Sequence, residues 1–169
     1  GSGSGATYTT PGSAGIVVDS PSGANGGNGN QVTVNAGGSV NTMSGTSGTA
    51  ILASGGGFAN VANAGTVTGS TYLGGGSVTG NTPQTGSSVA ASAASAVASG
   101  TFENYGTYHA GPMVDAALLA NYGTVNVGMP GAEVGVTTVT GDFMQTGSGR
   151  LGVTIDSLNN TAGHLYVGG

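Results

Sequence analysis

Short alternations of apolar and polar residues run along most of this chain, separated by glycine-rich turns. Gln31-Val32-Thr33-Val34-Asn35 alternates with a period of two, and Leu151, Val153 and Ile155 alternate in the same way. Thr49-Ala50-Ile51-Leu52-Ala53 is a short apolar run bounded by glycines on both sides. Runs of this length, rich in β-branched residues and bounded by turn residues, predict many short β-strands.

One phrase returns three times: Asn63-Ala64-Gly65-Thr66-Val67, Asn104-Tyr105-Gly106-Thr107-Tyr108 and Asn121-Tyr122-Gly123-Thr124-Val125. Asn and Gly tolerate left-handed backbone angles, so we expect them to form a corner. The Thr and the residue after it then begin a stiff extended segment. Repetition of a turn-plus-strand unit is typical of a solenoid of stacked strands.

The spacing of the copies gives a first estimate of the rungs. The asparagines are 41 and then 17 residues apart, which a rung of about 20 residues fits as two rungs followed by one. Seven or eight rungs at about 4.8 Å each would make a rod of about 35 Å. In register, Asn104 would lie over Asn121 and Tyr105 over Tyr122, forming ladders of like side chains. The fold class predicted is all-β, a right-handed parallel β-helix.

The segment from Ser87 to Ser99 does not fit this pattern. It has no Gly or Pro and is rich in Ala. Val89, Ala93 and Val97 fit a helical stripe, but the same residues also fit an alternating strand. Alanine favours a helix, whereas small residues suit a narrow rung. The sequence leaves both structures open for 87–99.

Composition narrows the classes of function. The chain has 169 residues, a formal net charge of −5, one Arg and no Lys. A surface with one basic residue offers little to phosphates, so no nucleic-acid partner is expected. The sequence contains no run of 18 apolar residues, so no membrane-spanning helix is predicted. The absence of cysteine rules out a disulfide scaffold.

Candidate chemistry is sparse. The best group of titratable residues is Glu103, His109 and Asp115, and its simpler interpretation is three separate solvated residues. Gly147 to Gly152 matches G-x-G-x-x-G, but no helix and no suitable acidic residue follow it. Gly26 to Val32 resembles a single calcium-binding nonapeptide without its carboxylate, and Asn159-Asn160-Thr161 is a sequon by pattern. We therefore expect no enzyme activity: no catalytic, cofactor-binding or metal-binding residue is predicted, and no cofactor.

Two patterns leave a binding function open. Tyr105, Tyr108 and Tyr122 could form an exposed stripe for carbohydrate stacking, although their spacing follows the repeat and favours a structural ladder. Flat rows of threonine could order water or contact sugar, which predicts Thr-x-Thr on successive rungs. The threonines fit this irregularly: Thr33, Thr66, Thr68, Thr79, Thr138 and Thr140.

The C-terminal part of the sequence contains three motifs that are more specific than the repeat. Thr138-Val139-Thr140-Gly141-Asp142-Phe143-Met144-Gln145 is followed by Gly149-Arg150-Leu151-Gly152-Val153-Thr154-Ile155-Asp156 and then by Gly163-His164-Leu165-Tyr166-Val167-Gly168. These three phrases resemble the stretch just ahead of the autochaperone-like region in passenger domains of Gram-negative autotransporters (type V secretion). The match covers about 30 residues, and His164 departs from it because an acidic residue is usual there.

The resemblance implies a division of the chain and a location. Residues 1–5 would be a linker or cut end, 6–137 β-helix rungs, and 138–169 the C-terminal rungs. The protein would be exported and extracellular at the cell surface, anchored in the outer membrane through a translocator barrel expected in the full-length chain. It also implies that apolar residues of the last rungs form a folding nucleus that templates the rungs above: Phe143, Leu151, Val153, Ile155, Leu165 and Val167.

Three functions follow from these observations. The first is a non-catalytic passenger segment that acts as a stalk and adhesin, with self-association or a host or neighbouring cell surface as partner. Near-neutral faces favour such association because they repel each other weakly. The alternative is a carbohydrate- or ice-binding β-solenoid, and an enzyme acting on polysaccharides is the third. The structural repeat residues expected to carry the fold are Asn63, Gly65, Asn104, Tyr105, Gly106, Asn121, Tyr122 and Gly123.

Overall fold

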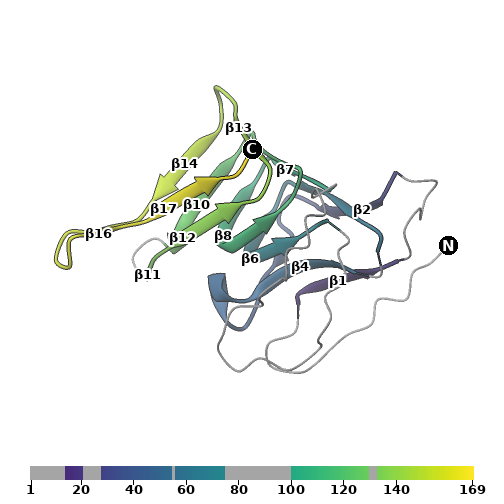
Figure 1. Cartoon of the computed structure of the whole chain (residues 1–169), viewed down its shortest axis with the longest axis horizontal. Coiled ribbons are helices and arrows are strands. Elements are labelled where there is room, and N and C mark those ends of the chain that lie inside the picture. The colour runs from purple at the N-terminus through teal and green to yellow at the C-terminus, as the bar shows by residue number, and fades with distance from the viewer. Residues whose placement is uncertain (1–13, 21–27, 55, 75–99, 130–132) are drawn as a thin grey trace.

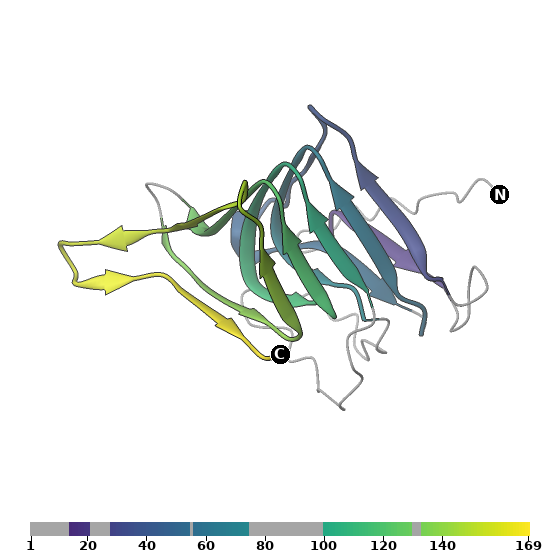
Figure 2. The same ribbon diagram turned by 90° about the horizontal axis from the view of Figure 1, so that it is seen from above.

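Parallel strands stack into the rungs of a β-helix in the computed structural model (Figures 1 and 2). The structure describes residues 14–20, 28–54, 56–74, 100–129 and 133–169. Nearly all regular structure in these residues is β, and the strands of the two large sheets pair in parallel except at β11. The predicted fold class, an all-β parallel β-helix, is therefore confirmed.

The first face of the coil is a five-stranded parallel sheet in the order β13-β9-β7-β5-β2. Figure 2 shows these strands side by side along the length of the coil. Each rung contributes one short strand to this face: β2 (Asn30–Val34), β5 (Ala59–Asn63), β7 (Thr101–Asn104), β9 (Leu118–Asn121) and β13 (Asp142–Gln145).

The second and third faces belong to one larger sheet, because two long strands bend and serve both. These are β6 (Thr66–Tyr72) and β8 (Thr107–Asp115). On the second face, the first half of β6 pairs with β3 (Ser39–Val40) and that of β8 with β10 (Thr124–Met129), which in turn pairs with β14 (Arg150–Val153). Their second halves belong to the third face with β1 (Ile16–Asp19), β4 (Thr49–Ser54), β12 (Val136–Val139) and β17 (His164–Val167).

Three short elements lie at the corner between the second and third faces. They are the 3-10 turn η2 (Gly45–Ser47), β11 (Glu133–Val134) and the hairpin of β15 (Ile155–Asp156) with β16 (Thr161–Ala162). Figure 1 shows the hairpin projecting away from the coil. In β6 the same corner is made by a shift of register at Gly69, whose φ is 129°.

The core is made of apolar columns that cross the rungs in register. On the first face the column is Val32, Val61, Phe102, Leu119 and Phe143. On the second it is Val40, Val67, Tyr108, Val125 and Leu151. The period of two sends these side chains inward, and burying them is the main favourable term for the fold. Phe102 and Tyr108 stack across the interior with ring centroids 4.7 Å apart.

The predicted number of rungs is wrong. Asn63 pairs directly with Asn104, so the 41-residue interval is one rung and not two. Five strands form the first face within the described residues, where seven or eight rungs were expected. The longer interval contains residues 75–99, so the segment 87–99, for which the sequence left two structures open, lies outside the described residues.

The predicted reason for glycine at the repeated corner is also wrong. Gly65, Gly106 and Gly123 do not have positive φ, and neither do the asparagines before them. What requires glycine is close approach, since a Cβ at Gly106 would lie 2.2 Å from the carbonyl oxygen of Gly65. A Cβ at Gly123 would meet Gly106 at the same distance. Each corner glycine thus leaves room for the carbonyl of the rung before it.

For one residue of the expected folding nucleus, Ile155, the position predicted from the sequence pattern is wrong. Leu151 and Val153 point inward on β14, in register with the buried Val125 and Val127. Ile155 does not continue that strand, because β14 ends at Val153 and the chain turns out into the β15–β16 hairpin. Ile155 is 74% exposed there, so placing it on one face with the other two was wrong. The folding role of the remaining residues stays a prediction.

Replacing Gly106 by alanine should destabilise the protein because the new methyl group would collide with backbone atoms of the rung before it. We expect a loss of about 2–3 kcal/mol in the free energy of unfolding, measured by chemical denaturation. Gly147→Ala is the matched control, since nothing lies within 4 Å of its added Cβ. Equal losses in the two variants would show that glycine serves this corner through chain flexibility and not through close packing.

Candidate functional site

A buried ladder of side-chain amides runs through the corner between the first and second faces. The Nδ2 of Asn63 donates to the Oδ1 of Asn104 at 2.9 Å, and Asn104 donates to Asn121 at 2.9 Å. Asn121 then donates to the Oε1 of Gln145 at 3.0 Å. The three asparagines are fully buried. The predicted position of Asn104 over Asn121 is confirmed, and Gln145 extends the same chain of bonds.

Each amide of the ladder also holds the backbone of the next rung. Asn63 donates to the carbonyl of Thr107 at 3.0 Å, Asn104 to that of Thr124 at 2.9 Å, and Asn121 to that of Arg150 at 2.9 Å. Because a buried amide without partners is costly, these bonds fix the register of every rung they join. At the first rung of the ladder, the Oδ1 of Asn63 accepts from the backbone N–H of Gly65 at 3.0 Å.

The length of the corner depends on the residue that occupies the ladder position. Where it is asparagine, two residues connect the first face to the second. Where it is Val34 or Gln145, four residues do so. The sequence analysis missed Gln145 as a ladder residue, because the Asn-x-Gly-Thr phrase is absent around it. Its place two residues after the inward-facing Phe143 is the signal that could have identified it.

The predicted ladder of Tyr105 over Tyr122 is also present. The two rings stack with centroids 4.7 Å apart and an interplanar angle of 9°. The third tyrosine of the expected stripe, Tyr108, is fully buried, and its hydroxyl donates to the carbonyl of Gly69 at 3.0 Å. Tyr105 and Tyr122 each cover one ring face of the other. This arrangement matches the structural interpretation of the tyrosines better than an open stripe for sugar stacking.

The outer side of the second face carries one regular column of threonine. Thr66, Thr107 and Thr124 are in register across three rungs, and Arg150 follows them. The neighbouring outward column is mixed, since Thr68 is followed by His109, Asn126 and Gly152. Thr-x-Thr therefore occurs on one of these four strands, and the second threonine row that an ice-like lattice would need is interrupted.

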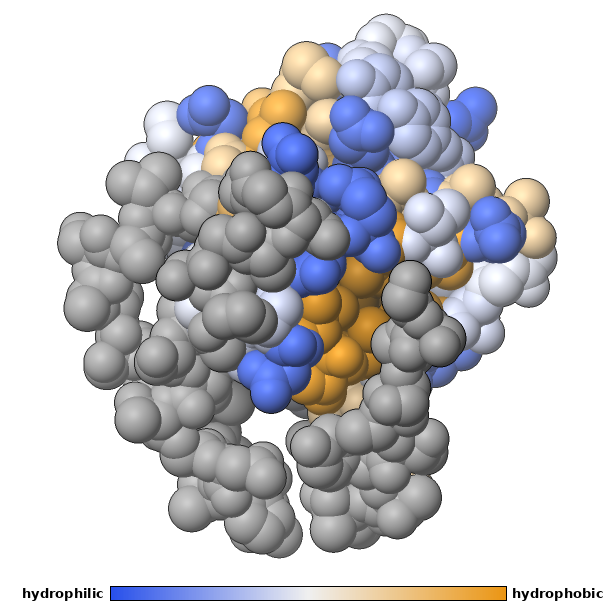
Figure 3. Space-filling view, turned by 90° about the vertical axis from the view of Figure 1, so that its right-hand side faces the viewer, coloured by the Kyte–Doolittle hydropathy of each residue, from blue (hydrophilic) through white to orange (hydrophobic). Residues whose placement is uncertain are grey.

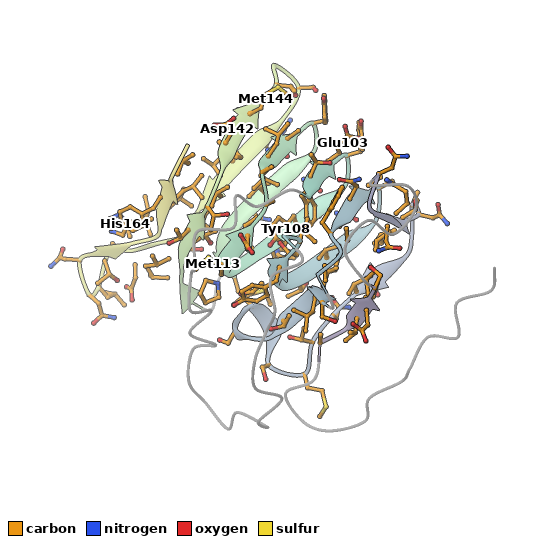
Figure 4. The ribbon with its side chains drawn as sticks, turned by 45° about the vertical axis from the view of Figure 1, so that its right-hand side comes forward. Glu103, Tyr108, Met113, Asp142, Met144 and His164 are labelled. Carbon is orange, nitrogen blue, oxygen red and sulfur yellow. The ribbon has the colours of Figure 1, made fainter. Side chains whose placement is uncertain are left out.

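Glu103, His109 and Asp115 are not brought together. Glu103 is on β7 in the first face and accepts a hydrogen bond from the Tyr105 hydroxyl at 3.1 Å. His109 and Asp115 are both on β8, but the bend of this strand lies between them, so His109 belongs to the second face and Asp115 to the third. Figure 4 shows Glu103 on the side of Met144 and Asp142, far from His164.

The remaining candidate carboxylates and motifs do not form a shared site within the described residues. Asp19 accepts from Ser54, Asp115 from Thr140, and Asp156 from Asn159, which lowers the pKa of the Asp156 carboxyl. Within the described ranges, no three His, Asp or Glu side chains lie close enough to hold a metal ion. Gly147–Gly152 leads into strand β14 and not into a helix. The nonapeptide-like run from Gly26 lies partly outside the residues that the structure describes.

Removing the central amide of the ladder should destabilise the whole coil. Asn104→Ala deletes the bonds that the amide donates to Asn121, Thr124 and Gly106 and the acceptor used by Asn63, so we expect a loss of about 2–4 kcal/mol in the free energy of unfolding. The control is Asn35→Ala, an exposed asparagine at the corner of the first rung, which should change stability by less than about 0.5 kcal/mol.

Asn104→Asp distinguishes the lost bonds from the cavity. An ionised carboxylate at position 104 would face the acceptors of Asn121 and Thr124, so its pKa should be raised in the folded state. Relative to the unchanged chain, this variant should gain stability as the pH falls from about 7 to about 4, because the protonated acid regains a donor. If its deficit does not change with pH, the ladder bonds are not the cause.

His109 should make stability depend on pH. Burial lowers the pKa of its imidazole, which lies 3.4 Å from the Nδ2 of Asn126. The unfolded chain therefore binds the proton more readily, and the free energy of unfolding should fall as the pH drops below about 6.5. The difference between the unchanged chain and His109→Asn, from denaturation at about pH 8 and about pH 5, measures this contribution. A difference that is constant over this range would contradict it.

Comparison with protein-family models, with curated proteins and with solved structures finds no match for this chain. The resemblance to autotransporter passengers therefore depends on the phrases of residues 138–169, and function has to be argued from the geometry above. Among the residues described here, no helix is long and apolar enough to cross a membrane.

Proposed function

We propose that this chain is a non-catalytic structural segment of an autotransporter passenger, acting at the cell surface as a stalk and adhesin. The observation that carries the proposal is the uninterrupted amide ladder from Asn63 to Gln145. Its buried bonds favour a rigid coil in which the corner between the first and second faces keeps the same register from rung to rung. A rigid rod of this kind can hold an adhesive surface at a distance from the membrane.

The outer surface supports the adhesive part of the proposal. The chain carries six acidic residues and one Arg in 169 residues, so two coils lying side by side repel each other weakly. The outward columns of the second face present mainly hydroxyl and amide groups. Many weak polar contacts along parallel rods give avidity without any single deep site. The partner is a second coil or a cell surface.

Sedimentation velocity over a range of protein concentrations tests this function. We expect association that increases with concentration and persists from about 0.05 M to about 1 M salt, where the screening length is roughly 3 Å. Persistence follows because near-neutral faces have little charge attraction to screen. The double variant Glu103→Gln, Asp115→Asn should associate to the same extent, since the proposal gives these carboxylates no catalytic task. A strict monomer at all concentrations would overturn the adhesive role.

A further inference from the structure

The outer surface of the first face has a step between β5 and β7. Ala62 on β5 is in register with Glu103 on β7, and Ala64 occupies the corner position that Tyr105 occupies one rung later. Two methyl side chains are thus followed by two long side chains in the same columns. Because an alanine side chain ends at Cβ, Glu103 and Tyr105 extend beyond the rung before them. We call these four residues the notch.

Tyr105 has one covered and one open ring face. The ring of Tyr122 stacks on it from the following rung, with centroids 4.7 Å apart. On the side of the preceding rung the column contains only the methyl group of the exposed Ala64, and Tyr105 is 52% exposed. A flat group can therefore lie against this face as Tyr122 lies against the other. Figure 3 looks at the molecule from the side of β1 and β2, toward which the open ring face is turned, and shows hydrophilic side chains around a hydrophobic centre.

Glu103 places a negative charge at the edge of this ring. Its Oε2 accepts a hydrogen bond from the Tyr105 hydroxyl at 3.1 Å, which keeps the carboxylate beside the ring. Figure 4 shows Glu103 at the outer surface of the coil. Arg150 is the only Lys or Arg in the sequence, and it lies on the second face two rungs further on. No lysine or arginine of this rung or of its neighbours is therefore available to neutralise the carboxylate.

A guanidinium group fits both parts of the notch. It is planar, stacks on aromatic faces and presents paired N–H donors to a carboxylate. An ammonium group has the charge but no flat surface, so it would make the poorer contact with the ring. A neutral sugar ring can stack on a tyrosine but gains nothing from the charge of Glu103. The net charge of −5 adds a weak general attraction for a basic partner.

We propose that the notch binds an arginine side chain of a different protein, whose guanidinium stacks on Tyr105 and pairs with Glu103. The arginine takes the space that a long side chain at Ala64 would fill, so recognition depends on the small residues as well as on the charge. This site lies on the first face and requires charge. The lateral association proposed above uses the outward columns of the second face and persists in high salt, so either can fail alone.

The peptide acetyl-Gly-Arg-Gly-amide is the probe for this site, added to the full chain labelled with ¹⁵N. We expect saturable changes of chemical shift at the backbone amides of Ala64, Glu103 and Tyr105. The same peptide with citrulline, which keeps the flat shape without the charge, should bind at least about fivefold more weakly. A lysine peptide should also bind at least about twofold more weakly. Raising the salt from about 0.05 M to about 0.5 M should weaken the binding of the arginine peptide. No saturable shift, or equal binding of the arginine and citrulline peptides, would overturn the proposal.

Three variants of the chain locate the site, and their unfolding midpoints show whether the fold is kept. Ala64→Leu fills the space beside the Tyr105 ring while both binding residues remain, so saturable binding should be lost. Glu103→Gln should weaken binding at least about fivefold. Asp142→Asn is the matched control, because it removes the same charge from an exposed position on the same outer face, and its affinity should be unchanged. Equal losses in the two charge variants would contradict the proposal.

Two other occupants would give distinct results. If cellotriose, a neutral sugar, shifts the same amides with equal or higher affinity, the notch is a carbohydrate site. If Arg150→Gln reduces the association of the chain with itself and the arginine peptide dissociates the oligomers, the occupant is Arg150 of a second copy. Either result would overturn the proposal of a different protein as partner, while the lateral association is judged by its persistence in high salt.

Discussion

The buried amide ladder is the constraint on which the other features of this coil depend. A side-chain amide in an apolar interior must find partners for its donors and its acceptor. Here it finds them only if the next rung is in register, because the acceptors are the next amide and a backbone carbonyl just beyond the corner. The apolar columns determine which face of each strand points inward, since a slip of one residue would turn them outward. The amide bonds form in one register of each rung on the next, so they give the stacked strands a single defined structure.

The corner glycines are set by the spacing of the rungs. The carbonyl of one glycine occupies the space of a side chain on the next, and this holds at Gly65, where the rung before it has Val34 in place of an amide, as well as at Gly106 and Gly123. Glycine is therefore a consequence of the tight stacking and not of an unusual backbone angle. The four-residue corners after Val34 and Gln145 show the contrary case, since the chain takes a longer path where the two-residue asparagine corner is missing.

Sequence reasoning recovered what local pattern determines. Local patterns placed the strands expected at 31–35 and 49–53 to within one residue, and the repeated motif identified the Asn and Tyr ladders correctly. It failed where distance along the chain does not measure distance in space. The interval of 41 residues between Asn63 and Asn104 is one rung, because these two residues pair directly, and no periodicity of the sequence encodes that. Ile155 was misplaced for a related reason, since alternation continues through Thr154 although the chain leaves the sheet there. Gln145 was missed because its role depends on a partner 24 residues earlier.

The corners of the coil differ in how much change they can absorb. The corner between the first and second faces changes little, because even its four-residue form after Gln145 presents the same two acceptors to Asn121. The corner between the second and third faces accommodates extra residues of β8 opposite Gly69, the η2 turn after β3 and a complete hairpin after β14 without disturbing the pairs on either side. In such a scaffold, one corner of the coil maintains the fold, and a different corner accepts changes of sequence and length. New peptide sequence can therefore accumulate along one line of the rod while the opposite edge preserves the architecture.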